Sequence, residues 1–194
     1  MSKVIVFTNL TLDGVMQAPA RPDEDRRGGF EYGGWAAPYA AMTQAGDSIG
    51  AIGALLLGRR TYEDFYAVWP KQKESPFSAM LDNMQKYVAS TTLSEPLPWI
   101  NSTLLKGDAT ETVARLKQES GTGLVIMGSG ALVQSLMQAN LVDKYVLLIH
   151  PLVLGSGRRL FPEGGAAATL QLVGARTTSA GVVIATYQLA EENR

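Results

Sequence analysis

Short runs of apolar residues, separated by segments with helical patterning, are the feature that most constrains the fold of this chain. Strands are expected at residues 3–8, 54–58, 86–90, 124–128 and 144–150, with a shorter strand near 99–103. A strand that is buried on both faces reads as a continuous apolar run, and parallel strands need helical crossovers between them. The sequence therefore predicts an α/β fold in three layers, with a mostly parallel central sheet flanked by helices.

The segments between these strands, and the last residues of the chain, complete the predicted architecture. Helices are expected over residues 38–49, from Arg59 onward, over 77–84, from Asp108 to about Ser120, and over 131–139. Residues 170–190 read as two strands joined around Ser179–Gly181, which predicts an antiparallel hairpin. Residues 9–35 are rich in Gly, Pro, Asp and Arg, so a long loop is expected there. Loops of that length usually bind or cover a ligand.

The composition limits the classes of function. With 194 residues, of which 46% are hydrophobic and 18% charged, the chain is expected to form one globular domain spanning residues 1–194. Its net charge of −1 and its pI near 5.9 argue against nucleic acid and anionic membranes as partners. The chain has no cysteine and one histidine, so no metal site is expected, and the lack of cysteine fits a reducing cytoplasm. No apolar stretch approaches the roughly 20 residues of a membrane span.

A polar segment follows the strand at 54–58. In open α/β sheets, ligands bind beyond the carboxyl ends of the strands, where helix N-termini present free N–H groups. Gly58 is followed by Arg59, Arg60 and Thr61. Guanidinium groups bind phosphate bidentately, and the threonine hydroxyl adds a donor at the same helix start. The segment therefore suits a phosphate-bearing ligand, and it equally suits a solvated arginine pair at the start of a helix.

Two glycines lie at the end of the strand expected at 124–128 and just beyond it. Gly128-Ser129-Gly130, with Ala131 after it, would let the backbone approach a pyrophosphate closely. The same residues also fit an ordinary tight turn. Because residue 133 is Val, the segment does not match the G-x-G-x-x-G fingerprint of dinucleotide-binding proteins.

Two more polar segments are expected at the same edge of the sheet. Residues 154–159, with the sequence LGSGRR, form either an anion-holding turn or a flexible link with two exposed arginines. Ser90 and Thr91 provide hydroxyl groups at the end of another strand. Taken one at a time, none of these segments identifies a ligand.

Taken in order, the segments resemble the dihydrofolate-reductase-like superfamily, and within it the reductase domain of riboflavin biosynthesis, the bifunctional deaminase-reductase C-terminal group. The resemblance covers nearly the whole chain. The segments that carry it are Thr11–Gly14, Leu57–Tyr62, Tyr87–Ser90, Ile126–Gly130 and Pro151–Phe161. The last of these, P-x-x-L-G-x-G-x-x-L-F, favours the riboflavin-type reductases over true dihydrofolate reductase.

The resemblance implies NADPH as the cofactor, with hydride transfer to a small heterocyclic or carbonyl substrate, as in 5-amino-6-(5-phosphoribosylamino)uracil reductase. It implies that Arg59, Arg60 and Thr61 meet the cofactor's phosphates, together with Gly58. Ser90 and Thr91 are implied to hold the 2′-phosphate, which favours NADP over NAD. Residues 128–131 are implied to lie under the nicotinamide and pyrophosphate, and Arg158 is assigned to the substrate. Relatives commonly pair and apolar edge strands tend to be covered, so a homodimer is expected.

Two departures from the family narrow the activity. True dihydrofolate reductases carry a carboxylate on the helix before the G-R-x-T segment, and residues 33–39 contain none, which argues against folate reduction. The zinc deaminase half of the two-domain enzyme needs H-x-E and P-C-x-x-C sets, so a chain without cysteine is expected to have no deaminase domain. A reductase of pteridines or other heterocycles, and a non-catalytic NADPH-binding protein, remain as alternatives.

The proton donor is sought among the carboxylates of the long loop. Asp13 is the first candidate for a catalytic residue, because a carboxylate at a strand end binds a substrate donor or positions a water. The alternative is an aspartate that hydrogen-bonds its own turn. Glu31 is the second candidate and is assigned to the substrate. Trp35 and Tyr39 either stack on a flat substrate or cover the core, and His150 is expected to be a packed side chain.

Overall fold

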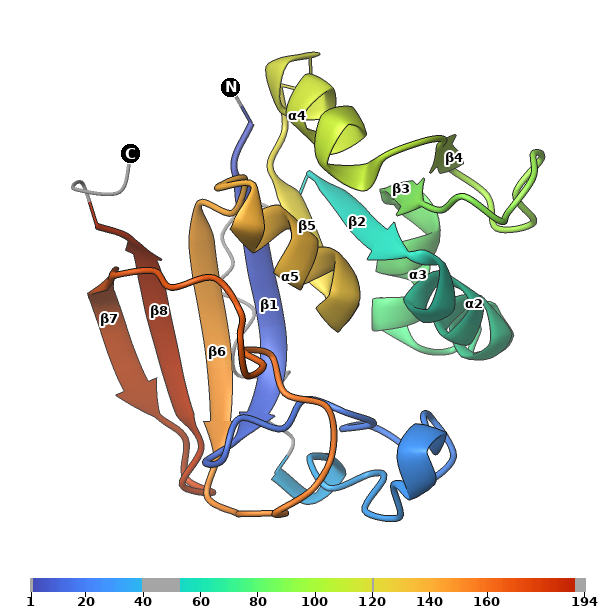
Figure 1. Ribbon diagram of the computed structural model, residues 1–194. Helices are drawn as coiled ribbons and strands as arrows, with labels where there is room; N and C mark the ends of the chain where they lie inside the picture. Colours follow the sequence, from blue (N-terminus) through green and yellow to red (C-terminus); the bar gives the residue numbers. More distant parts are fainter. Residues whose placement is uncertain (1, 40–52, 120, 191–194) are drawn as a thin grey trace.

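The computed structural model describes residues 2–39, 53–119 and 121–190 (Figure 1). Within these residues, eight strands form one sheet in the order β4-β3-β2-β5-β1-β6-β8-β7. The strands are β1 (Val4–Thr11), β2 (Ala54–Gly58), β3 (Gln85–Ala89), β4 (Ser102–Leu105), β5 (Leu124–Met127), β6 (Lys144–His150), β7 (Leu170–Thr177) and β8 (Val183–Leu189). Neighbours from β4 to β6 pair in parallel, and β8 pairs antiparallel with both β6 and β7.

Helices cover both faces of the parallel part of the sheet. They are α2 (Arg59–Val68), α3 (Pro76–Asn83), α4 (Ala109–Glu119) and α5 (Gly130–Gln138), with short 3-10 turns η1 (Arg27–Gly29), η2 (Ala37–Tyr39) and η3 (Trp69–Lys71). Side chains of α4 and α5 pack on one face, and side chains of α2 and α3 pack on the other. This arrangement confirms the predicted three-layer α/β fold with an antiparallel C-terminal hairpin. None of the helices described has both the length and the hydropathy that a bilayer crossing requires.

The continuous apolar runs explain why the sheet is buried on both sides. Successive side chains of a strand point to opposite faces. In β1, Val4 and Val6 belong to the core under α4 and α5, while Ile5 and Phe7 belong to the core under α2 and α3. All four are at most 8% exposed, and burial of each such side chain contributes about 1.5–3 kcal/mol.

Two expected elements differ from the structure. The short strand expected near 99–103 is β4, which begins only at Ser102. Asn101 has a φ of 54°, which lies outside the strand region, and the buried Trp99 uses its backbone N–H to bond the Tyr62 hydroxyl at 3.0 Å. The helix expected over 38–49 falls outside the described residues, except for residues 38 and 39, which belong to η2.

The first strand is longer than expected, and its extra length shapes the sheet. β1 pairs with β5 only from Val4 to Phe7, but it pairs with β6 from Ile5 to Thr11. The sheet therefore opens on one side of β1 beyond Phe7, at the carboxyl ends of β5 and β2. Ligands bind at such openings in parallel α/β sheets.

The long loop after β1 has a small core of its own. Val15, Ala18, Phe30, Trp35 and Ala36 are buried together in it. The Trp35 indole Nε1 donates a hydrogen bond of 2.7 Å to the backbone oxygen of Gln17. The loop is therefore packed and hydrogen-bonded, and it forms one wall of the opening beside β1.

Candidate functional site

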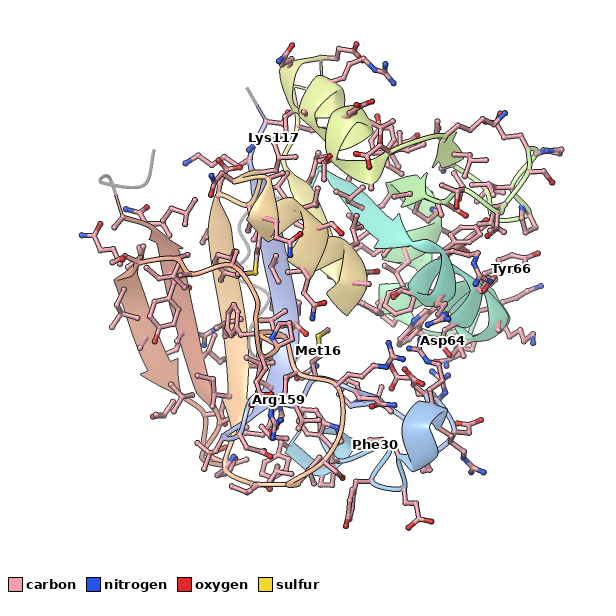
Figure 2. The ribbon with its side chains drawn as sticks, viewed as in Figure 1. Met16, Phe30, Asp64, Tyr66, Lys117 and Arg159 are labelled. Atoms are coloured by element: carbon pink, nitrogen blue, oxygen red, sulfur yellow. The ribbon has the colours of Figure 1, made fainter. Side chains whose placement is uncertain are left out.

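A cleft of about 1690 Å³ lies at the opening of the sheet. Its lining comes from residues 7–9 of β1, the loop segment 16–27, the β2–α2 junction, the β5–α5 junction and residues 158–159. Figure 2 shows Met16, in the loop that follows β1, beside the start of α5, and Asp64 on the side of α2 that faces this loop. Ligand sites commonly measure about 300–1,000 Å³, so the cleft has room for a dinucleotide beside a second small molecule.

Ser129 joins the first turns of the two helices that open on the cleft. Its hydroxyl accepts a hydrogen bond of 2.9 Å from the backbone N–H of Gly58 and donates one of 2.8 Å to the Thr61 hydroxyl. Its backbone is left-handed, with φ 58° and ψ 48°, and it gives α5 no side-chain cap. Gly58 gives α2 no side-chain cap either. The first N–H groups of both helices thus have no side-chain acceptor from their N-cap residues, and such groups bind anions in many proteins.

Arginines dominate the charge of the cleft. Seven of the ten arginines in the chain line it, and no lysine among the described residues does. The seven are Arg21, Arg26, Arg27, Arg59, Arg60, Arg158 and Arg159. The lining also contains three carboxylates. It therefore carries a surplus of four positive charges, in a chain whose net charge is −1. Such a concentration of guanidinium groups favours an anionic, phosphate-bearing ligand.

The arginines differ in how strongly they are held. Arg59 forms an ion pair of 3.1 Å with Glu63 one turn along α2. Arg21 reaches from the loop to Asp64 of α2, which ties the two walls of the cleft together. Arg26, Arg60 and Arg158 have no ion pair within the part of the chain that the structure describes, although the charge of Arg158 helps to lower the pKa of Asp25.

The loop wall is organised by Gln17, which the sequence reasoning missed. Its side chain is buried and donates hydrogen bonds to the backbone oxygens of Asp25, at 3.1 Å, and Arg27, at 3.0 Å. Its Oε1 accepts a bond of 3.0 Å from the backbone N–H of Arg158. One amide therefore sets the position of both arginine-bearing segments. The only sequence signal was the clustering of arginines at 21–27, because no local pattern distinguishes this glutamine from a surface one.

Most of the predicted cofactor residues do meet at the cleft. Those in its lining are Gly58, Arg59, Arg60, Thr61, Gly128, Ser129, Gly130 and Ala131, and the predicted substrate residue Arg158 lines it too. Their roles toward a ligand stay predictions. Gly130 is closely covered, because a Cβ added there would lie 2.8 Å from the Met16 sulfur.

Ser90 and Thr91 form the hydroxyl pair that is expected to hold a 2′-phosphate. They do not belong to the described lining of the cleft, whereas Ala89 just before them does. The Ser90 Oγ accepts hydrogen bonds of 3.1 Å from the backbone N–H groups of Thr92 and Leu93, so it closes its own turn. Thr91 is exposed beside it.

Asp13 lies outside the described lining of the cleft, and its carboxylate is occupied. It accepts hydrogen bonds from the Thr11 hydroxyl at 2.6 Å and from the backbone N–H groups of Leu154 and Gly155 at 3.2 and 2.9 Å. The Thr11 hydrogen bond, followed by the two backbone bonds, lowers the pKa of this carboxyl. This geometry matches the alternative reading of Asp13 as a residue that fixes a turn.

The other predicted substrate residues also lie away from the described lining. Glu31 is exposed. The rings of Trp35 and Tyr39 pack against the imidazole of His150 in T-shaped arrangements, with centroids 5.2 and 5.0 Å from it. His150 is fully buried, and its Nε2 lies 2.9 Å from the Asn9 Oδ1. Burial lowers the pKa of His150 to about 4, so the ring is neutral near pH 7.

The carboxylates that do line the cleft are Glu24, Asp25 and Asp64. Burial raises the pKa of the Glu24 carboxyl, although the backbone N–H groups of Ala20 and Arg21 bond it. Asp25 pairs with Arg27 and Asp64 with Arg21. Nowhere in the described ranges do three or more His, Cys, Asp or Glu side chains gather as a metal site would need.

Comparisons with known proteins show the family of the chain. The family model described as the RibD C-terminal domain matches residues 2–184. The uncharacterized protein YyaP of Bacillus subtilis (strain 168) is 31% identical over 148 residues, which cover 73% of this chain and 76% of that protein. The uncharacterized protein YwjB of the same organism is 32% identical over 117 residues, which cover 58% of this chain and 60% of that protein.

Solved structures share the fold. A putative riboflavin biosynthesis protein from Shewanella sp. PV-4 is similar with a TM-score of 0.68 at 19% identity, covering 97% of this chain and 99% of that one. Dihydrofolate reductase from Enterococcus faecalis, complexed with NADP(H) and RAB-propyl, gives a TM-score of 0.62 at 15% identity, with 97% of each chain covered. The deaminase/reductase of Thermotoga maritima gives 0.63 at 13% identity, covering 97% of this chain and 57% of that one. With its fold, its cleft and a family match over residues 2–184, the chain belongs to the RibD C-terminal domain family.

Proposed function

We propose that this protein is an NADPH-dependent reductase that transfers a hydride to a small heterocyclic or carbonyl substrate, similar to 5-amino-6-(5-phosphoribosylamino)uracil reductase. Its membership of the RibD C-terminal domain family supports a reductase. The observation that carries the proposal is the arginine-rich cleft at the open end of the sheet, with seven guanidinium groups and two helix N-termini without side-chain caps.

The charge and the donors of the cleft fit NADPH. A pyrophosphate suits the N–H groups at the starts of α2 and α5, which Ser129 holds together. A 2′-phosphate adds a charge of about −1.5 to −2 at neutral pH. The surplus of four positive charges offsets a ligand that carries both groups. Because Ser90 closes its own turn, we assign preference for NADPH over NADH to the arginines of the cleft, with Arg59 and Arg60 nearest the predicted phosphate segment.

NADPH supplies the hydride when it is bound, so the tasks left to the chain are binding, orientation and exclusion of water. Arg59, Arg60 and Thr61 would bind the phosphates, and the segment 128–131 would support the rest of the dinucleotide. Arg158, which has no ion pair in the described structure, would orient the substrate. The Arg21–Asp64 ion pair would keep the loop wall closed against α2.

Fluorescence titration with NADPH and NADH tests the binding step. We expect NADPH to bind more tightly than NADH, with an affinity that falls as salt is added. Arg59→Ala should weaken NADPH binding about tenfold or more, because a charge-assisted hydrogen bond contributes about 1.5–3 kcal/mol. Arg115→Ala is the matched control, since Arg115 is exposed on α4 and lies outside the described lining. Equal affinity for both nucleotides, or an Arg59→Ala variant that binds as the wild type does, would contradict the proposal.

Turnover assays separate the alternatives. Oxidation of NADPH with a pyrimidine substrate supports the proposed reaction, and oxidation only with a pteridine or another heterocycle supports a different reductase on the same cleft. Tight NADPH binding with no oxidation in either assay supports a non-catalytic NADPH-binding protein. The cysteine-free chain suits a reducing compartment, and we propose the cytoplasm as its location.

A further inference from the structure

We propose that Glu24 is the proton donor of this enzyme and that its carboxyl group contacts the substrate in the cleft. The inference rests on the proposed function, because hydride transfer to a C=O or C=N bond leaves an oxygen or nitrogen atom that needs a proton. A side chain that contacts this atom can deliver the proton as a general acid. Asp13, the first candidate from the sequence, lies outside the described lining of the cleft, so the donor is sought among the residues that do line it.

The reduction needs one hydride and one proton. The hydride forms a new C–H bond at the carbon of the C=O or C=N group, and the π electrons move to the oxygen or nitrogen. That atom takes the proton from the Glu24 carboxyl, so the O–H bond of the acid breaks and a carboxylate remains. Water returns a proton to this carboxylate before the next cycle. The substrate gains two electrons and two hydrogen atoms, and NADPH is oxidised to NADP⁺.

The described lining of the cleft offers few groups that can donate a proton near neutral pH. It contains no His, Lys, Cys or Tyr side chain. Its arginines keep their protons in proteins, so they bind anions but do not act as acids. The ionisable groups that remain in the described lining are the carboxyl groups of Glu24, Asp25 and Asp64.

The two aspartates are held in their charged form by arginines. Asp25 pairs with Arg27, and Asp64 pairs with Arg21. A guanidinium group beside a carboxylate favours the charged form. Burial acts to raise the pKa of Asp25, but the hydrogen bonds from Arg27 outweigh it and the pKa is lowered. Glu24 differs from both, since it forms no ion pair within the described part of the chain.

The turn that contains Glu24 holds its carboxyl group in one orientation. The Glu24 Oε2 accepts hydrogen bonds from the backbone N–H groups of Ala20, at 2.7 Å, and Arg21, at 3.2 Å. The backbone N–H of Glu24 closes the turn by donating to the Arg21 oxygen at 3.3 Å. Oε1 has no hydrogen-bond partner among the described residues. Because Oε2 serves as the acceptor, a protonated Glu24 carries its hydrogen on Oε1, and this is the oxygen left for the substrate.

The surroundings of Glu24 favour its protonated form. Burial raises the pKa of this carboxyl, although the backbone bonds from Ala20 and Arg21 oppose the shift. Two charged groups also act on it: Asp64 of α2 raises its pKa, and the Arg21 guanidinium lowers it. A bound phosphate would add negative charge to the cleft and favour the proton further. Asp13 is the opposite case, because both of its oxygens accept hydrogen bonds and its pKa is lowered.

Glu24→Gln tests the proposal, because the amide keeps the shape and an oxygen for the two backbone bonds but has no acidic proton. We expect kcat to fall about a hundredfold or more, and the loss of wild-type kcat with rising pH to disappear. NADPH should bind the variant as tightly as the wild type. Glu119→Gln is the matched control, since Glu119 is exposed at the end of α4 and outside the described lining.

The outcomes separate this inference from the proposed function. A Glu24→Gln variant that keeps its kcat and the wild-type pH profile would overturn the donor role and leave the proposed function standing. A wild type that binds no NADPH, or that reduces no substrate, would contradict the proposed function and the donor role with it. Glu24→Asp should regain part of kcat together with its pH dependence. A raised KM with unchanged kcat in Glu24→Gln would show that Glu24 only binds the substrate.

NMR spectroscopy measures the protonation of Glu24 without turnover. With glutamate labelled with ¹³C at its side-chain carboxyl, the signal of Glu24 is the one missing from the spectrum of Glu24→Gln. Glu24→Asp identifies the same signal if the glutamine variant does not fold. We expect this carboxyl to titrate above its ordinary value of 4.5, and higher still with NADPH bound. A Glu24 signal that titrates at or below 4.5 in the NADPH complex would overturn the proposal.

Discussion

The Ser129 hydroxyl donates a hydrogen bond of 2.8 Å to the Thr61 hydroxyl and so fastens the start of α5 to the start of α2. The Thr61→Val variant keeps the shape of the side chain and removes the acceptor. We expect it to lower the free energy of unfolding by about 1 kcal/mol and to weaken NADPH binding about tenfold, because the two helix starts would no longer be held in register.

Urea unfolding and fluorescence titration of the same samples measure both effects. Thr103→Val is the matched control: Thr103 lies on the edge strand β4, its hydroxyl likewise accepts a hydrogen bond, of 3.0 Å from Gln85 Nε2, and a valine suits a strand. If Thr61→Val binds NADPH as tightly as the control does, the link between the two helices has no role in the cleft.

The layers of the fold could be predicted because a strand that is buried on both faces consists of a continuous apolar run. Residues 54–57 and 124–127 are uninterrupted apolar runs, and all of them are at most 4% exposed. The full length of β1 could not be predicted in this way. Residues 8–11 read as the start of a polar loop, and only their pairing with β6, some 140 residues later in the chain, makes them strand.

The cleft could be predicted in part for the same reason. Gly58–Thr61 and Gly128–Ala131 directly follow buried strands, and parallel strands bring their carboxyl ends to one edge. The roles of Gln17 and Asp13 depend on partners at 154–158, about 140 residues away in the sequence. A carboxylate or amide in a loop looks the same in the sequence whether it faces a ligand or a distant backbone N–H.

Gly157 allows the loop at 154–159 to approach the loop after β1. A Cβ added there would lie 2.7 Å from both Phe30 Cε2 and Val15 Cγ1, and its φ is 117°. We expect Gly157→Ala to lower the free energy of unfolding by about 2–4 kcal/mol, from left-handed strain and overpacking together. Thermal and urea unfolding measure this loss.

Gly155→Ala is the control for the strain alone. Gly155 has a φ of 74°, but an added Cβ would meet nothing within 4 Å. Gly155→Ala should therefore lower the free energy of unfolding by only about 1–2 kcal/mol. Similar losses for the two variants would show that the contact of residue 157 with Phe30 and Val15 is not tight in solution.

His150 should make stability depend on pH over a defined window. Its pKa is lowered from 6.5 to about 4 by burial, so between these values the unfolded chain binds a proton that the folded chain does not. Linkage then requires the free energy of unfolding to fall as the pH is lowered from about 6.5 to about 4, by roughly 3 kcal/mol in total. The raised pKa of Glu24 acts in the opposite direction, so the comparison needs a variant.

His150→Gln removes the titrating ring and keeps a group that can bond Asn9. The variant should lose this part of the pH dependence, whatever its stability at pH 7. Because the chain has a single histidine, one imidazole signal in the NMR spectrum reports the pKa directly. Two results would refute a buried neutral ring: a pKa of His150 near 6.5 in the folded state, or the same dependence of the unfolding free energy on pH in the variant and the wild type.

Asp13→Asn separates the two readings of Asp13. If the carboxylate fixes the turn, the variant should lose about 1–2 kcal/mol of stability near pH 7, because charge-assisted bonds to Thr11, Leu154 and Gly155 are weakened. The lowered pKa of Asp13 means that this stability is present above the ordinary carboxyl value of about 3.9 and is lost as the pH falls through the folded-state value. In that case NADPH turnover by the folded variant should keep its pH profile. A loss of turnover by a hundredfold or more, with unchanged stability and a shifted profile, would instead identify Asp13 as the proton donor.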